Sequence, residues 1–209
     1  MSVNSKIAIL AVSVLLAAAP AWAAARSSEA PGEVTLHAVA VNMSNVGQAG
    51  ATPIDIGITD WTTNEEATRL KDALREKGPR GLTSALQDLK RVGYIRHSSG
   101  GLGWSLRYAK RIALPDGGYR IVFATDRPMT IAERFERPLT AEYDLVVGEV
   151  RVGADGKGEG KLVPMAAVTY DETDDTIDIE NYASQPVTLS KVTELGSKPA
   201  KKPAREDVK

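Results

Sequence analysis

The alternation of apolar and polar residues along the chain predicts a protein built mostly from antiparallel strands. Residues 54–58 alternate strictly, which is typical of a strand with one buried face. Similar short runs rich in strand-forming residues recur along the chain, separated by Gly, Pro, Asn and Asp. The predicted strands cover residues 34–43, 54–58, 94–97, 102–114, 119–126, 142–152, 161–170, 176–182 and 187–193.

The apolar pattern changes to helical spacing between residues 62 and 89. Thr62 and Thr63 are each followed three residues later by a glutamate, which fits a capping box, so a helix is expected to begin at one of them. Gly78 is typical of a helix end and Pro79 of a first turn, which predicts a second helix after the first. Each helix has a single apolar stripe, so we expect the pair to pack on a sheet.

These elements predict an α+β fold, in which an antiparallel β meander forms a bent sheet or open barrel with an inserted helical pair. The clearest turn, at residues 115–118, joins two strands in a register that places Leu114 opposite Tyr119 and Arg107 opposite Asp126. In this register one face is apolar. Its members are Trp104, Leu106, Tyr108, Ile112, Ile121 and Phe123.

The N-terminus predicts export from the cell. Lys6 precedes an apolar run over residues 7–19, and Ala21-Trp22-Ala23 fits a signal-peptidase site, so we expect a signal peptide of residues 1–23 cleaved after Ala23. Cleavage after Ala25 and a retained anchor are the alternatives, although the run is shorter than the roughly 20 residues that span a bilayer. Without cysteine the N-terminus is not lipidated. We expect a soluble periplasmic or secreted protein with no transmembrane span in its mature chain.

Composition and charge divide the rest of the chain. Residues 24–33 read as a flexible lead-in, 34–195 as one α+β domain, and 196–209 as a disordered basic tail with five basic and two acidic residues. The formal net charge of −1 gives no global field for nucleic acid, so no specific nucleic-acid partner is expected. A chain of 209 residues without cysteine must be stabilised by its core alone. The oligomeric state is left open.

Most catalytic and metal motifs are absent. The glycine-rich residues 153–161 lack the spacing of a phosphate loop or a calcium loop and predict a hairpin turn. The acidic residues 171–175 fit a solvated turn better than a calcium site. His37 and His97 have no metal-ligand spacing, and no nucleophile elbow occurs. We therefore expect no cofactor and no metal, and no catalytic residue can be assigned from the sequence.

The remaining chemical signal is a group of charged residues on and near the central hairpin, which could bind a carboxylate or phosphate. The alternative without a binding role is a solvent-facing ladder of cross-strand ion pairs. We expect a non-catalytic binding or envelope-associated module, whose partner is an envelope protein or a small anionic ligand. The alternative is a hydrolase with Asp126 or Glu149 as base near Arg107. The candidate ligand-binding residues are Arg107, Asp126, Arg111, Arg120, Arg127 and His97.

Several short motifs occur together in this chain: residues 58–62, 93–96, 106–109, 114–118, 124–128, 156–160 and 180–182. With them, residues 54–192 resemble a family of hypothetical secreted bacterial proteins. The resemblance implies export and a single domain over that span. It implies no activity, and no functional residues follow from it.

Overall fold

A computed structural model describes residues 31–43, 49–127, 145–172, 176–181 and 185–198. Within these ranges the chain forms nine strands and one helix. In chain order they are β1 (Glu33–Asn42), β2 (Gly50–Ile58), α1 (Asn64–Gln87), β3 (Gly93–His97), β4 (Trp104–Ala113), β5 (Tyr119–Thr125), β6 (Leu145–Val152), β7 (Lys157–Asp171), β8 (Thr176–Asn181) and β9 (Val187–Lys198).

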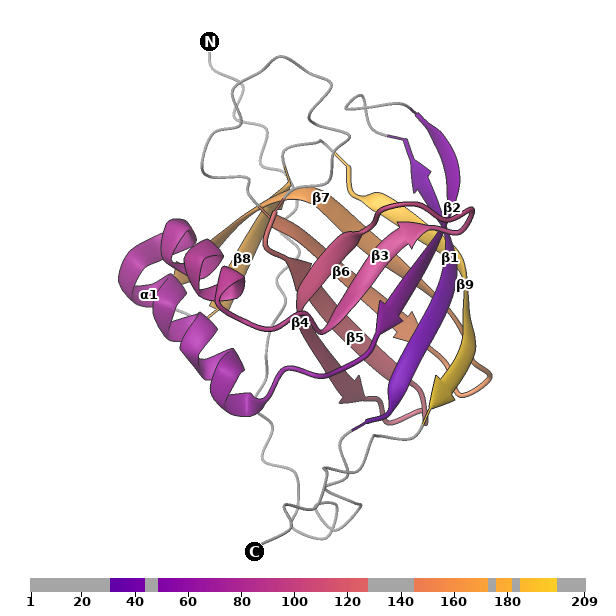
Figure 1. Cartoon of the computed structure of the whole chain (residues 1–209), viewed down its shortest axis with the longest axis horizontal. Helices are drawn as coiled ribbons and strands as arrows, with labels where there is room; N and C mark the ends of the chain where they lie inside the picture. The colour runs from indigo at the N-terminus through magenta and orange to yellow at the C-terminus, as the bar shows by residue number, and fades with distance from the viewer. Residues whose placement is uncertain (1–30, 44–48, 128–144, 173–175, 182–184, 199–209) are drawn as a thin grey trace, which may run out of the picture.

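The strands form a closed antiparallel barrel (Figure 1). From β1 to β7, each strand pairs with the next along the chain, and β9 lies between β7 and β1 and completes the ring. β7 is the longest strand, at 15 residues, and its second half leaves the barrel. There, residues 166–171 pair with β8, which lies outside the ring of the other eight strands.

The expected fold class is therefore wrong in two respects. The sheet closes on itself instead of forming a bent sheet or an open barrel. The inserted helical pair is a single helix, α1, bent at Gly78. Closure depends on the pairing of β9 with β1, from opposite ends of the domain, and local hydrophobic patterns carry no information about that pairing.

Alternate residues of the barrel strands point inward and form one continuous cluster. Leu36, Ile56 and Phe123 are fully buried there. Trp61, in the connection between β2 and α1, joins the same cluster, and its indole N–H donates a hydrogen bond to the carbonyl of Gly32 at 3.1 Å. Because side chains occupy the inside of the barrel, its outer surface is the part open to a ligand.

α1 begins at one of the two predicted threonines. Thr63 is the N-cap: its hydroxyl accepts from the Glu66 N–H at 3.1 Å, and the Glu66 carboxylate accepts from the Thr63 N–H at 2.8 Å. This reciprocal pair is a capping box. The hydroxyl of Thr62 instead accepts from the backbone N–H of Ala109 in β4, at 2.9 Å, and so joins the helix start to the barrel.

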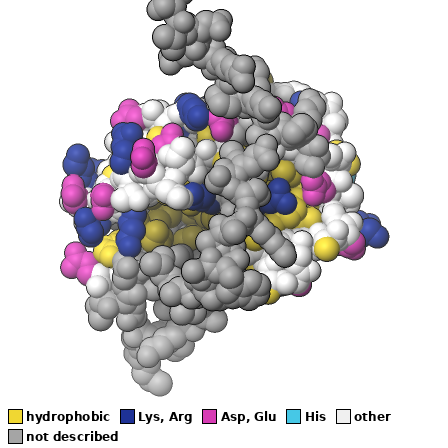
Figure 2. All heavy atoms as spheres, turned by 90° about the horizontal axis from the view of Figure 1, so that it is seen from below, with side chains coloured by type: hydrophobic (Ala, Val, Ile, Leu, Met, Phe, Trp, Pro, Cys, Tyr) yellow, Lys and Arg dark blue, Asp and Glu magenta, His cyan; other side chains and the backbone are white. Residues whose placement is uncertain are grey.

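The helix bends where the sequence places Gly and Pro together. Gly78 has φ 65° and ψ −162°, a left-handed conformation that favours glycine, and Pro79 follows within the helix. Both arms lie on the outside of the barrel through their leucines, which pack with residues of β6 and β7. Seen from below, charged side chains gather over α1 at the left, beside a band of hydrophobic ones (Figure 2).

The hairpin of β4 and β5 differs from its predicted register. Ala113, not Leu114, lies opposite Tyr119, and a β-bulge between Leu106 and Tyr108 shifts the pairing once more. Ile112 consequently pairs with Arg120 on the outer face, while other predicted members of the apolar face, such as Ile121, stay inside. A one-residue slip reverses the direction of every side chain, so the predicted charged and apolar faces are mixed at this point.

Candidate functional site

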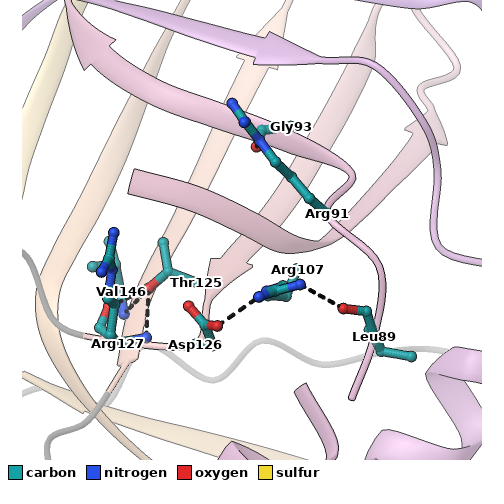
Figure 3. A network of polar contacts seen from close by, with 8 residues as sticks. All are labelled: Leu89, Arg91, Gly93, Arg107, Thr125, Asp126, Arg127 and Val146. Atoms are coloured by element: carbon teal, nitrogen blue, oxygen red, sulfur yellow. Dashed lines mark hydrogen bonds and ion pairs between the residues drawn. The ribbon is translucent and has the colours of Figure 1, made fainter. Parts of the chain in front are cut away.

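The predicted ion pair between Arg107 and Asp126 is present (Figure 3). Arg107 Nε donates to Asp126 Oδ2 at 3.0 Å, and Arg107 Nη1 donates to the carbonyl oxygen of Leu89 at 2.7 Å. Arg107 lies at the bulge in β4, and Leu89 lies in the connection between α1 and β3. The guanidinium group therefore ties this connection to the barrel, which is a structural task.

A second part of the network in Figure 3 joins the hydroxyl of Thr125 to backbone groups. The fully buried Thr125 hydroxyl accepts from the Val146 N–H at 3.0 Å and donates to the carbonyl oxygen of Arg127. These bonds hold the end of β5 against the start of β6. The side chain of Arg127 is exposed.

The other candidates lie apart from this network. The Arg111 guanidinium lies 3.9 Å from the centre of the Tyr119 ring, on the same face as the buried Ile121. Arg120 lies on the outer face, with Nη1 3.8 Å from Glu149 and no partner for Nε within the described residues. His97 is exposed at the end of β3. These residues are not brought together into one site with Arg107.

A more concentrated group lies on the outer face of β3 and was not predicted. The Arg96 guanidinium lies over the ring of Tyr94, with its Cζ 4.9 Å from the ring centroid, and the Arg91 guanidinium lies over the same ring at 5.7 Å. Both arginines are exposed. We call these three residues the β3 face. A cation over an aromatic ring is attracted by the ring quadrupole, so Tyr94 holds two positive groups close together.

Gly57 allows this arrangement. It lies opposite Tyr94 in the pairing of β2 with β3. A Cβ atom at position 57 would lie 2.4 Å from Tyr94 Cζ, so the tyrosine ring occupies the space that a side chain would fill. The Arg91 guanidinium is also fixed by the backbone, because its Nε donates to the carbonyl oxygen of Gly93 at 2.9 Å (Figure 3).

Three polar side chains, from β1, from β2 and from the turn after β3, meet beside the β3 face. His37 of β1 and Asp55 of β2 are directly opposite each other, and His37 Nδ1 lies 3.0 Å from Asp55 Oδ1. The Ser98 hydroxyl donates to the same carboxylate oxygen at 2.8 Å and lies 3.2 Å from His37 Nδ1. Arg96 Nε is 3.8 Å from the other oxygen, Asp55 Oδ2. We call His37, Asp55 and Ser98 the His37 cluster.

The surroundings of Asp55 keep it charged. Its side chain is 13% exposed, and this partial burial opposes ionisation. Hydrogen bonds from His37 and Ser98, together with the charges of His37 and Arg96, outweigh burial and lower the pKa of Asp55 below its usual value. The cluster therefore holds a carboxylate that accepts several hydrogen bonds at neutral pH.

The geometry of the His37 cluster differs from a catalytic triad. In a triad, the serine and the carboxylate contact opposite nitrogens of the imidazole. Here Ser98 and Asp55 both contact Nδ1, so Ser98 is not placed for activation by His37. The arrangement can bind and orient a ligand, and Ser98 helps to fix the carboxylate.

The sequence contained one signal for this cluster. His37 and Asp55 each stand between apolar residues in two successive predicted strands, a pattern that is typical of side chains on the outer face. The loop between these strands is long, and its length left their register open. The contribution of Ser98 carried no signal, because it follows β3 directly in a turn.

The described residues contain no group of three or more His, Cys, Asp or Glu side chains suited to a metal ion. In the same part of the chain, no helix is long and apolar enough to cross a membrane. A groove does lie between the two arms of α1, lined by acidic and basic side chains together. Its mixed charge indicates no particular ligand.

The predicted signal peptide, residues 24–30 of the predicted lead-in, residues 173–175 of the acidic turn and residues 199–209 of the tail lie outside the described residues. β9 itself continues to Lys198, three residues into the segment predicted as tail. The resemblance to hypothetical secreted proteins stays a prediction. No family model, no curated protein and no solved structure matches the chain.

Proposed function

We propose that the protein is an exported binding module, without catalysis of its own, that holds anionic groups of the cell envelope on its β3 face. The observation that carries this proposal is the pair of exposed guanidinium groups of Arg91 and Arg96 over the single ring of Tyr94. Guanidinium groups bind carboxylates and phosphates through paired hydrogen bonds. Groups held in advance on a rigid strand lose less entropy on binding.

Two further features support binding over the hydrolase alternative. Asp126, the first candidate base, is held by Arg107. Glu149, the second, lies on the outer face of β6 near Arg120. A general base needs a free carboxylate that faces the reacting proton, whereas the Asp126 carboxylate accepts a hydrogen bond from Arg107.

The proposal is tested by titrating the protein with poly-L-glutamate at low salt in a calorimeter. We expect the double variant Arg91→Gln/Arg96→Gln to bind at least about tenfold more weakly, because each lost charge-assisted hydrogen bond contributes about 1.5–3 kcal/mol. The matched control is Arg75→Gln/Arg151→Gln, which removes two exposed arginines elsewhere. Equal loss in both double variants, or no binding by the wild type, would refute the proposed function.

A further inference from the structure

The His37 cluster presents a hydrogen-bond acceptor next to the β3 face. The ionised carboxylate of Asp55 can only accept hydrogen bonds, so when the His37 imidazole carries a single hydrogen, this hydrogen is on Nδ1, which faces the carboxylate at 3.0 Å. The remaining ring nitrogen, Nε2, then carries a lone pair. Nε2 has no hydrogen-bond partner within the described residues, and the His37 side chain is 36% exposed.

Donors and an acceptor are therefore fixed around one carboxylate. Asp55 contacts His37 through Oδ1 and lies 3.8 Å from Arg96 through Oδ2. A guanidinium donor and an imidazole acceptor are thus placed on either side of the same side chain. A ligand that satisfies both needs an anionic group for Arg96 and a hydroxyl group nearby that can donate to Nε2.

The shape of the site indicates a long ligand. The β3 face lies on the outside of a barrel whose interior is occupied by its own core. Arg96 and Tyr94 lie in β3 and Arg91 lies just before it, so the two positive groups stand over one ring at an open surface. An exposed site of this kind binds a single small anion weakly, whereas a polymer engages several groups at once.

We infer that the ligand is an acidic polysaccharide, in which sugars carry a carboxylate together with free hydroxyl groups. This inference rests on the proposed function, because the carboxylates are held by the β3 face. His37 is assigned the role of a specificity residue that accepts a hydrogen bond from a sugar hydroxyl through Nε2. Asp55 and Ser98 are positioning residues, which fix the imidazole and its hydrogen.

The test compares polygalacturonate, which carries carboxylates and hydroxyls, with poly-L-glutamate, which carries carboxylates alone. Calorimetry at pH 7.5 and low salt, with chains of matched length, gives both affinities. We expect the wild type to prefer polygalacturonate by about fivefold, the size of a net hydrogen bond. His37→Leu should abolish this preference, so that the variant binds the two polymers with equal affinity. His37→Gln should retain the preference, because the amide oxygen also accepts a hydrogen bond.

The outcomes separate the two proposals. If the wild type binds both polymers equally, the inference about polysaccharide fails and the proposed anion binding stands. If neither polymer binds, the proposed function fails and the inference fails with it. A preference that survives in His37→Leu would also overturn the inference, since another residue must then accept the hydrogen bond from the sugar hydroxyl. Circular dichroism of the variants shows whether each is folded.

Discussion

At the scale of single residues, Tyr119 couples stability to alkaline pH. Its hydroxyl donates to Glu194 Oε2 at 2.7 Å, and its side chain is largely buried. Burial, reinforced by the hydrogen bond and charge of Glu194, raises the pKa of Tyr119 well above its ordinary value. The native state therefore keeps the proton at a pH where the unfolded chain releases it. The stability that the protonated Tyr119 contributes is fully present below about pH 10, and it is lost as the pH rises further.

We therefore expect the wild type to lose about 1 kcal/mol more stability than Tyr119→Phe between pH 8 and pH 11. Phenylalanine keeps the buried ring and cannot ionise, so its variant shows a shallower decline. Urea unfolding at the two pH values measures the difference. The variant is expected to be less stable at pH 8, because Glu194 loses its donor. An equal decline in both proteins would show that Tyr119 does not control this effect.

Individual contacts were predictable to very different degrees. The pair of Arg107 and Asp126 was predicted, although from an incorrect register, because a long arginine side chain reaches its partner across a shifted ladder. The His37 cluster was missed, because short side chains meet only when the register is right. Short polar residues thus need the strand pairing to be known, whereas long ones tolerate errors in it.

At the scale of elements, local signals predicted the strands and the helix start well. The capping box at Thr63 and the break at Gly78 are chain-local, and both occur in the structure. The register of β4 with β5 was wrong because the turn and the bulge each shift the pairing. A bulge adds one residue to one strand and leaves the hydrophobic pattern almost unchanged, so it has no clear sequence signal.

The cap of α1 provides a prediction for this scale. Thr63→Ala removes the acceptor for the Glu66 N–H, and we expect it to lower the free energy of unfolding by about 1 kcal/mol. The matched control is Thr68→Ala, an exposed threonine one turn into the same helix. Alanine has the higher helix propensity, so Thr68→Ala should change stability by less than about 0.5 kcal/mol. Urea unfolding measures both, and similar losses would contradict the role of the cap.

At the scale of the whole molecule, closure of the barrel was beyond prediction from the pattern. The alternation in residues 187–193 predicted a strand and said nothing of its neighbours. In the structure, β9 bonds to β1 on one side and to β7 on the other. A closed ring leaves no free edge in the barrel itself, and the apolar faces of all its strands then point to one centre. The candidate site does not depend on closure, because β1, β2 and β3 pair with one another in chain order.

If β9 closes the barrel, its inward side chains must contribute far more to stability than its outward ones. Leu189 is fully buried, whereas Leu195 of the same strand is 62% exposed. Leu189→Ala should cost about 2–5 kcal/mol, because it leaves a cavity in the core. Leu195→Ala should cost less than about 0.5 kcal/mol. The two variants make the same chemical change in one strand, so urea unfolding isolates the effect of position. Equal losses would mean that β9 does not pack with its inner face against the barrel core, and the closed ring would then be wrong.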